Sequence, residues 1–161
     1  MSAIYRLKNL NLSQRNVVIA AWLVLSCNAA FFHALSELTP YDGWRAGVFF
    51  AATGALLTAY FATFLQLITW GPFARPVQSF LLLASALTAY FMMAYGVGID
   101  AGQIQNMMET DVNEVLDLLS LRLLAFMLLI AGLLLLWLWS TPAATLNWKQ
   151  TLRNKLIAVV L

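Results

Sequence analysis

The sequence contains few of the residues that build soluble domains and metal centres. Only 10% of its 161 residues are charged, whereas soluble domains carry about 25%. It has a single cysteine, Cys27, and a single histidine, His33. One cysteine excludes a disulfide framework and a cysteine-based metal site, and one histidine excludes a histidine-rich zinc or di-metal centre within this chain. The sequence therefore predicts neither a soluble domain nor a metal site of its own.

Apolar residues fill the place of the missing charges, at 62% of the chain, and they gather in long runs. Since about 20 apolar residues cross a bilayer core, we predict four full membrane spans, at about 17–35, 46–69, 77–97 and 121–139. The last six residues, 156–161, are again apolar, and we expect them to begin a fifth span near residue 156. The sequence is then a piece of a longer protein; the alternative is a short amphipathic tail on the membrane. The predicted fold is an all-α, polytopic membrane helix bundle.

The charges alternate from one connection to the next. Seven of the nine basic residues lie in the N-terminal tail and in the connections after the second and fourth spans: Arg6, Lys8, Arg15, Arg75, Lys149, Arg153 and Lys155. All seven acidic residues lie in the connections after the first and third spans: Glu37, Asp42, Asp100, Glu109, Asp111, Glu114 and Asp117. Because positively charged connections stay in the cytoplasm, we predict a cytoplasmic N-terminus and outward-facing acidic connections. A nucleic-acid partner is not expected.

Residues 100–117 form a polar island between the third and fourth spans. Asp100 and Gln103 are spaced as in a capping box, and the pattern that follows has one polar and one apolar face. We therefore predict an amphipathic surface helix at 101–119, which lies in the interface on the outward-facing side of the membrane. Asn106, Thr110 and Glu114 follow each other at i, i+4 and i+8 along one edge of this helix.

An amide, a hydroxyl and a carboxylate in a row suit a small group that carries both charge signs. The Glu114 carboxylate suits an ammonium, and the Asn106 amide and the Thr110 hydroxyl can donate to phosphate oxygens. Together they predict a binding site for a zwitterionic lipid headgroup, with phosphatidylethanolamine as the leading candidate. The alternative is that the three residues form the solvated face of an interfacial helix.

Three further polar residues could either contact a ligand or have a structural role. Arg45 and Arg122 are the only basic residues on the predicted outer side, so either can contact a lipid phosphate. Arginines in such places also anchor helix ends by reaching toward the headgroups. Asn28, in the middle of the first predicted span, is expected to hydrogen-bond a neighbouring helix rather than a ligand.

A family resemblance appears in and around the polar island. The sequence reads Y-G-x-x-x-D from residue 95, I-Q-N from 104 and E-T-D-x-x-E from 109. This pattern resembles the bacterial phosphoethanolamine transferases that modify lipid A, which include the mobile colistin-resistance enzymes. Asn28 with Phe31 and Phe32 resembles the same family more weakly. The resemblance covers essentially the whole chain, because the family begins with a five-helix membrane domain.

The resemblance implies a function that this chain performs only in part. In the family, phosphoethanolamine passes from phosphatidylethanolamine, the donor, to a threonine in a periplasmic zinc-dependent domain, and then to a phosphate of lipid A, the acceptor. The threonine and the zinc ligands would follow Leu161, so we expect no catalytic residue and no metal ligand here. The positions that match the family's substrate contacts are Asn106, Thr110 and Glu114. The resemblance implies a bacterial inner-membrane protein, inactive as this piece alone.

Two other functions stay open from the sequence. One is a free-standing small inner-membrane protein whose polar helix binds a lipid or a periplasmic protein. The other is a small transporter, which is disfavoured because no acidic residue lies inside a predicted span, where transport pathways usually place one.

Overall fold

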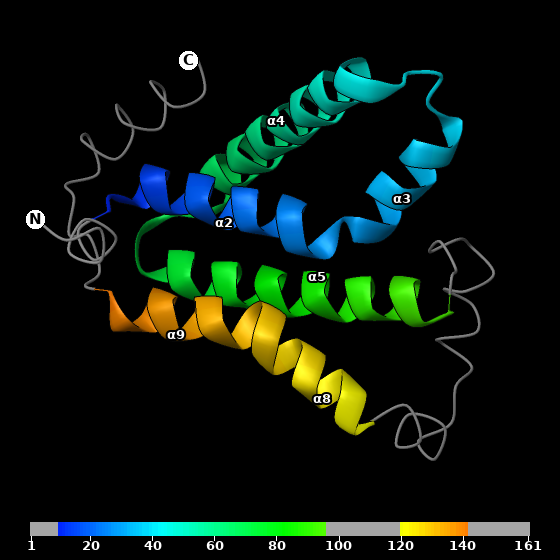
Figure 1. Ribbon diagram of the computed structural model, residues 1–161. Helices are drawn as coiled ribbons and strands as arrows, with labels where there is room; N and C mark the ends of the chain where they lie inside the picture. The colour runs from blue at the N-terminus through cyan, green and yellow to red at the C-terminus, as the bar shows by residue number, and fades with distance from the viewer. Residues whose placement is uncertain (1–9, 96–119, 142–161) are drawn as a thin grey trace, which may run out of the picture.

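A computed structural model describes residues 10–95 and 120–141 (Figure 1). The regular elements in this described part are helical: α2 (Leu12–Cys27), α3 (Ala29–Leu38), α4 (Gly43–Ile68), the short 3-10 helix η1 (Gly71–Phe73), α5 (Ala74–Tyr95), α8 (Leu121–Met127), the π-helical turn η2 (Leu128–Gly132) and α9 (Leu133–Ser140). Three stretches of this part are long and apolar enough to cross a membrane, and α2 with α3 is a fourth if that bent pair is one span. The predicted surface helix at 101–119 and the predicted start of a fifth span near 156 lie outside the described residues.

The helices are arranged with α2 and α5 in the middle of the bundle. α2 packs between α4 and α5, and α5 packs between α2 and the continuous α8–η2–α9 stretch (Figure 1). At one end, here called the α4–α5 end, lie the start of α2, the η1 turn and the end of α9. At the other, the α3–α4 end, lie residues 39–42, the end of α5 and the start of α8. The segment 96–119 therefore begins and ends at the α3–α4 end of the described helices.

Local sequence signals explain where α2 begins and how α4 turns into α5. The Asn11 side chain accepts a hydrogen bond from the Gln14 backbone N–H at 2.8 Å, and the Gln14 side chain accepts one from the Asn11 backbone N–H at 3.1 Å. This capping box starts the helix at Leu12, before the predicted span at 17–35. Gly71, with φ of 46°, and Pro72 make the tight turn after α4, because glycine adopts positive φ without steric cost.

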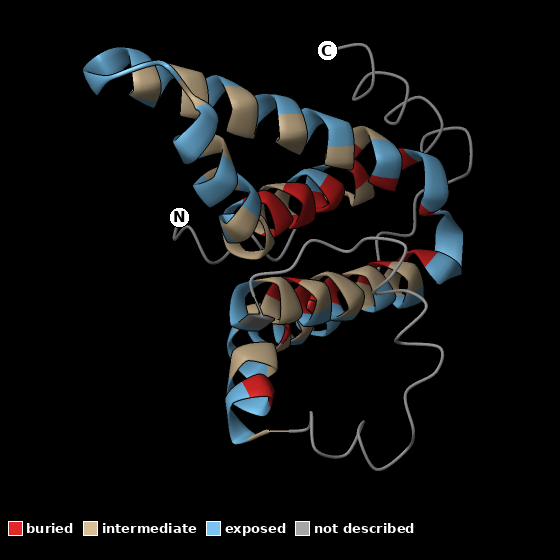
Figure 2. Ribbon diagram, turned by 90° about the vertical axis from the view of Figure 1, so that its right-hand side faces the viewer, coloured by how far each residue is buried: buried red, intermediate tan, exposed pale blue. Residues whose placement is uncertain are grey.

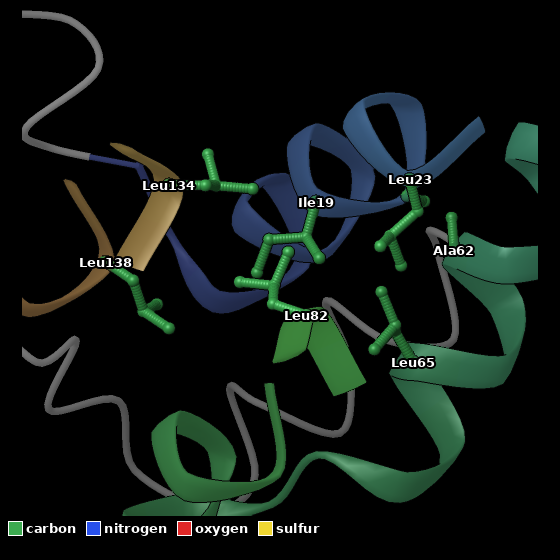
Figure 3. Packing of buried hydrophobic residues seen from close by; sticks show 8 residues of the cluster. Ile19, Leu23, Ala62, Leu65, Leu82, Leu134 and Leu138 are labelled. Atoms are coloured by element: carbon green, nitrogen blue, oxygen red, sulfur yellow. The ribbon is translucent and has the colours of Figure 1, made fainter. Parts of the chain in front are cut away.

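A hydrophobic cluster holds the α4–α5 half of the bundle together (Figure 3). Its members come from four helical stretches: Ile19, Ala20, Leu23, Ala62, Leu65, Leu82, Leu134 and Leu138. Leu82 of α5 points among the side chains of α2, and α4 contributes Ala62 and Leu65 (Figure 3). Because lipid tails are as apolar as leucine, close van der Waals packing rather than escape from water stabilises this contact in a membrane.

A buried polar cluster lies beside the hydrophobic one and consists of Asn16, Gln66, Thr69 and Gln78. All four are at most 2% exposed. The Asn16 amide donates to Gln66 Oε1 and to Thr69 Oγ1, both at 2.9 Å, and Asn16 Oδ1 accepts from Gln78 Nε2 at 2.6 Å. Asn16 of α2 is thus bonded to α5 and to the end of α4. Hydrogen bonds between membrane helices satisfy groups that would otherwise face hydrocarbon.

The two ends of the bundle are packed to different degrees. Figure 2 shows the buried residues concentrated along α2, α5 and α9 and near the C-terminal end of α4. In the part of the chain that the structure describes, α3 has no buried residue, α4 has none before Ala62, and α8 has only Leu123. Among the described residues, α3 and the first part of α4 are therefore less buried than the helices at the α4–α5 end.

The first predicted span is bent, which the sequence interpretation did not foresee. α2 and α3 meet at Asn28 with an angle of 61° between them. The Asn28 side chain donates to the Leu23 carbonyl of the preceding helix at 2.9 Å, so the prediction that it bonds a neighbouring helix is wrong. Its amide instead bonds a carbonyl of the preceding helix, and a side chain that inserts into the helical ladder is one cause of a helix kink.

Candidate functional site

The residues predicted to bind a headgroup lie between two described helix ends. Asn106, Thr110 and Glu114 belong to the segment 96–119, outside the described residues, and their roles stay predictions. The segment leaves the end of α5 and returns at the start of α8, and both ends lie at the α3–α4 end of the bundle (Figure 1). What the structure describes is therefore the frame to which the predicted site is attached.

One hydrogen bond joins the two sides of this frame. The Tyr90 hydroxyl of α5 lies 3.1 Å from the Ser120 hydroxyl, and the Tyr90 ring packs against Phe126 of α8 with centroids 5.7 Å apart. Ser120 Oγ also accepts from the Leu123 backbone N–H at 3.2 Å and so caps α8. A side-chain bond and a ring contact thus connect the two helices to which segment 96–119 is attached.

We expect Ser120→Ala to destabilise the bundle more than Tyr90→Phe. Tyr90→Phe removes one hydrogen bond, which is worth about 0.6 kcal/mol on average between membrane helices. Ser120→Ala removes the same bond and also the helix cap, which adds about 1 kcal/mol. Unfolding by SDS titration in mixed micelles measures both free energies. An equal loss in the two variants would show that the Ser120 cap contributes nothing.

The two arginines predicted to contact a lipid phosphate are exposed, and they lie on opposite sides of the bundle. Arg45 lies in the first turn of α4, 5.9 Å from the centre of the Trp44 ring, and Arg122 lies in the first turn of α8. Among residues 10–95 and 120–141 neither forms an ion pair. The starts of α4 and α8 lie on opposite sides of α2 and α5 (Figures 1 and 2), so the two arginines do not form one phosphate-binding pair.

The two described acidic residues and the basic residue Arg75 lie at opposite ends of the bundle. The acids Glu37 and Asp42 belong to the α3–α4 end, and Glu37 lies 3.8 Å from His33 as an exposed pair. At the α4–α5 end, the Arg75 guanidinium donates to the Thr141 carbonyl and lies 5.8 Å from the Trp139 ring centre.

The described residues do not fit a zinc site. No group of three or more histidine, cysteine, aspartate or glutamate side chains that could hold a metal occurs in this part of the chain. His33 and Glu37 supply only two ligands, both exposed, whereas a zinc site needs at least three protein ligands. No chemical step is therefore assigned to a metal here.

The sequence pattern did not reveal the polar cluster, which lies at the opposite end of the bundle from the points where segment 96–119 is attached. Asn16 and Gln78 are single amides at the margins of apolar runs, where loop residues are also common. Their spacing in the sequence carries no sign of their contact, since they lie 62 residues apart. Each printed bond of Asn16 joins another protein side chain, as in the structural networks that connect membrane helices.

Comparisons with known proteins agree on one family. The sequence matches the family described as phosphoethanolamine transferase EptA/EptB over residues 57–161. It is 31% identical to phosphatidylethanolamine transferase Mcr-2 of Escherichia coli over 119 residues, which are 72% of this chain and 21% of that protein. It is 26% identical to phosphoethanolamine transferase EptA of Escherichia coli strain K12 over 144 residues, which are 83% of this chain and 26% of that protein.

A solved structure has the same fold. The integral membrane protein lipooligosaccharide phosphoethanolamine transferase A (EptA) from Neisseria meningitidis superimposes with a TM-score of 0.82 at 17% identity. The match covers 91% of this chain and 27% of that one. The chain thus spans about a fifth to a quarter of the length of these relatives and corresponds to their membrane region. The chain belongs to the phosphoethanolamine transferase EptA/EptB family.

Proposed function

We propose that this chain is the N-terminal membrane domain of an enzyme that transfers phosphoethanolamine from phosphatidylethanolamine to lipid A. Its own task is to bind the donor lipid and to hold the headgroup for a zinc-dependent catalytic domain. The observation that carries this proposal is the family match over residues 57–161. That range includes the whole polar island, so the family relationship extends to the residues predicted to bind the headgroup.

In the proposed site, three side chains of one helix edge recognise the two charges of the headgroup. Glu114 accepts from the ammonium, while Asn106 and Thr110 donate to the phosphate. Ionic hydrogen bonds of this kind are about twice as strong as neutral ones. Arg45 or Arg122 adds a positive charge for the phosphate, and because these arginines belong to opposite flanks, one lipid uses only one of them.

The charges of the described helices support a location of the proposed site at the outer surface of the membrane. Glu37 and Asp42 mark the α3–α4 end, whereas Arg15 and Arg75 belong to the α4–α5 end. With the basic end in the cytoplasm, the α3–α4 end faces the periplasm of a bacterial inner membrane. The headgroup is then presented on the side where the lipid A acceptor and a periplasmic catalytic domain can reach it.

Lipid selectivity tests this function. The purified protein should bind vesicles or nanodisc lipid containing phosphatidylethanolamine more tightly than those with phosphatidylglycerol, which has no ammonium. Glu114→Gln should lower the affinity for phosphatidylethanolamine about 10- to 100-fold, because a hydrogen bond to a charged group contributes roughly 1.5–3 kcal/mol. Native mass spectrometry or a fluorescent-lipid displacement assay measures the difference.

Glu109→Gln is the matched control, since it makes the same chemical change in the same segment but off the predicted binding edge. It should leave the preference for phosphatidylethanolamine intact. Equal affinity for the two lipids in the unmodified protein, or an equal loss in the two variants, would contradict the headgroup site. Binding to a periplasmic protein with no lipid selectivity would instead favour the protein-partner alternative.

A further inference from the structure

Two helices of the bundle are interrupted about halfway along their length. The α2–α3 stretch breaks at Asn28, and the α8–α9 stretch contains the π-helical turn Leu128–Gly132. Neither interruption contains a proline. Helix kinks without proline arise at π-turns and where a side chain enters the backbone ladder, and these are the two causes seen here.

A single side chain connects the two interruptions. The indole N–H of Trp22, in the last turns of α2, donates to the carbonyl of Ile130 inside the π-turn at 2.8 Å. A π-turn changes the carbonyl pairing of its helix, and the indole provides a partner for one of these carbonyls. On the α2 side, the Ser26 hydroxyl donates to the Trp22 carbonyl at 2.6 Å, and such back-bonding bends helices.

The bundle is packed differently on the two sides of these interruptions. On the α4–α5 side lie the hydrophobic cluster and the polar cluster, which bond α2, α4 and α5 together. On the α3–α4 side, the described parts of α3 and of α4 up to Phe61 contain no buried side chain. Their contacts include an edge-on ring pair between Phe32 and Phe50, at a centroid distance of 6.4 Å. Regions with few buried contacts open at low free energy.

We propose that Asn28 and the π-turn Leu128–Gly132 are paired hinges, coupled through the Trp22–Ile130 hydrogen bond. The α4–α5 half is the fixed base, and α3 and α8 move relative to it. This movement changes the separation between α3 and α8 at the end of the bundle from which segment 96–119 leaves and to which it returns. The inference concerns the bundle itself and does not depend on the proposed lipid site.

Distances between spin labels test the hinges in the protein reconstituted in lipid nanodiscs. After Cys27→Ser removes the only native thiol, one pair of labels is placed at Glu37 of α3 and Leu124 of α8. A second pair is placed at Val17 of α2 and Leu136 of α9. The four positions are exposed. Both pairs span the same two interrupted stretches, on opposite sides of the breaks.

The expected result is a broader distance distribution for the pair on α3 and α8 than for the pair on α2 and α9. Trp22→Phe keeps an aromatic ring but removes the indole bond, and it should broaden the first distribution further while leaving the second unchanged. Trp139→Phe is the matched control. It removes another indole bond, from Trp139 to Ser79 Oγ at 3.1 Å between α9 and α5, and should change neither distribution.

Three results would overturn the proposal. One is an equally narrow distribution for both pairs in the unmodified protein, which is informative even if a variant fails to fold. Another is no effect of Trp22→Phe on the pair on α3 and α8. The third is an equal effect of Trp139→Phe, which would show general loosening rather than coupled hinges.

Discussion

Replacing Glu114 by alanine in the full-length transferase should reduce phosphoethanolamine transfer at least about 25-fold and abolish polymyxin resistance. Removing one partner of a hydrogen-bonded charge pair costs about 2–5 kcal/mol, and each 1.4 kcal/mol is a factor of ten in affinity. The ammonium of the donor would lose its carboxylate while the rest of the lipid still inserts into the membrane. Growth at increasing polymyxin concentration and mass spectrometry of extracted lipid A measure the two effects.

Asn106→Ala should give the same phenotype by a different route, through loss of a donor to the phosphate. Both variants should be expressed and inserted at the level of the unmodified protein, because the predicted surface helix is expected to turn these residues toward the lipid headgroups. Glu109→Ala is the control and should retain resistance. Resistance at the unmodified level in both Glu114→Ala and Asn106→Ala would rule out the headgroup site.

Replacing Asn16 by alanine should cause a large loss of stability in the bundle, about 2–4 kcal/mol. Asn16 makes hydrogen bonds with Gln66, Thr69 and Gln78. Bonds between membrane helices contribute about 0.6 kcal/mol on average and up to about 1.7. The variant loses all three at once and leaves their partners buried, with an added cost for each unsatisfied group. SDS titration in mixed micelles reports the change in unfolding free energy.

Thr58→Ala is the matched control for the polar cluster. The Thr58 hydroxyl donates to the Gly54 carbonyl of its own helix at 2.8 Å, so its removal leaves no side chain of another helix unsatisfied. Its unfolding free energy should change by less than about 0.5 kcal/mol, as is usual for substitutions away from special features. If Asn16→Ala is no more destabilising than Thr58→Ala, the cluster does not hold the helices together.

Much of the architecture could be predicted from the sequence because hydrocarbon imposes simple rules. A long apolar run has to form a helix to satisfy its backbone, so helices were expected where α4, α5 and α8–α9 lie. Family membership was also predictable, because the Y-G-x-x-x-D and E-T-D-x-x-E patterns sit at fixed spacing around the polar island. The headgroup residues themselves remain predictions, since they lie outside the described part of the chain.

The features that sequence reasoning missed depend on contacts between distant segments. The break at Asn28 contains no proline, and its side chain bonds a carbonyl of the preceding helix rather than a neighbouring helix. The π-turn at Leu128–Gly132 lies in an uninterrupted apolar run. The polar cluster joins residues 50 to 62 positions apart, which periodicity within a single helix does not reveal.

The long separation within the polar cluster sets an order of events during biosynthesis. Asn16 enters the membrane early, yet Gln66 follows 50 residues later and Gln78 follows 62 residues later. A ribosome adds about 5–20 residues per second, so the amide spends several seconds without its final partners. The Gly71–Pro72 turn then delivers α4 and α5 as a hairpin, with both partners close together in the chain. We therefore expect α2 to insert before its partners are synthesised, and the polar cluster to form only after the α4–α5 hairpin has inserted.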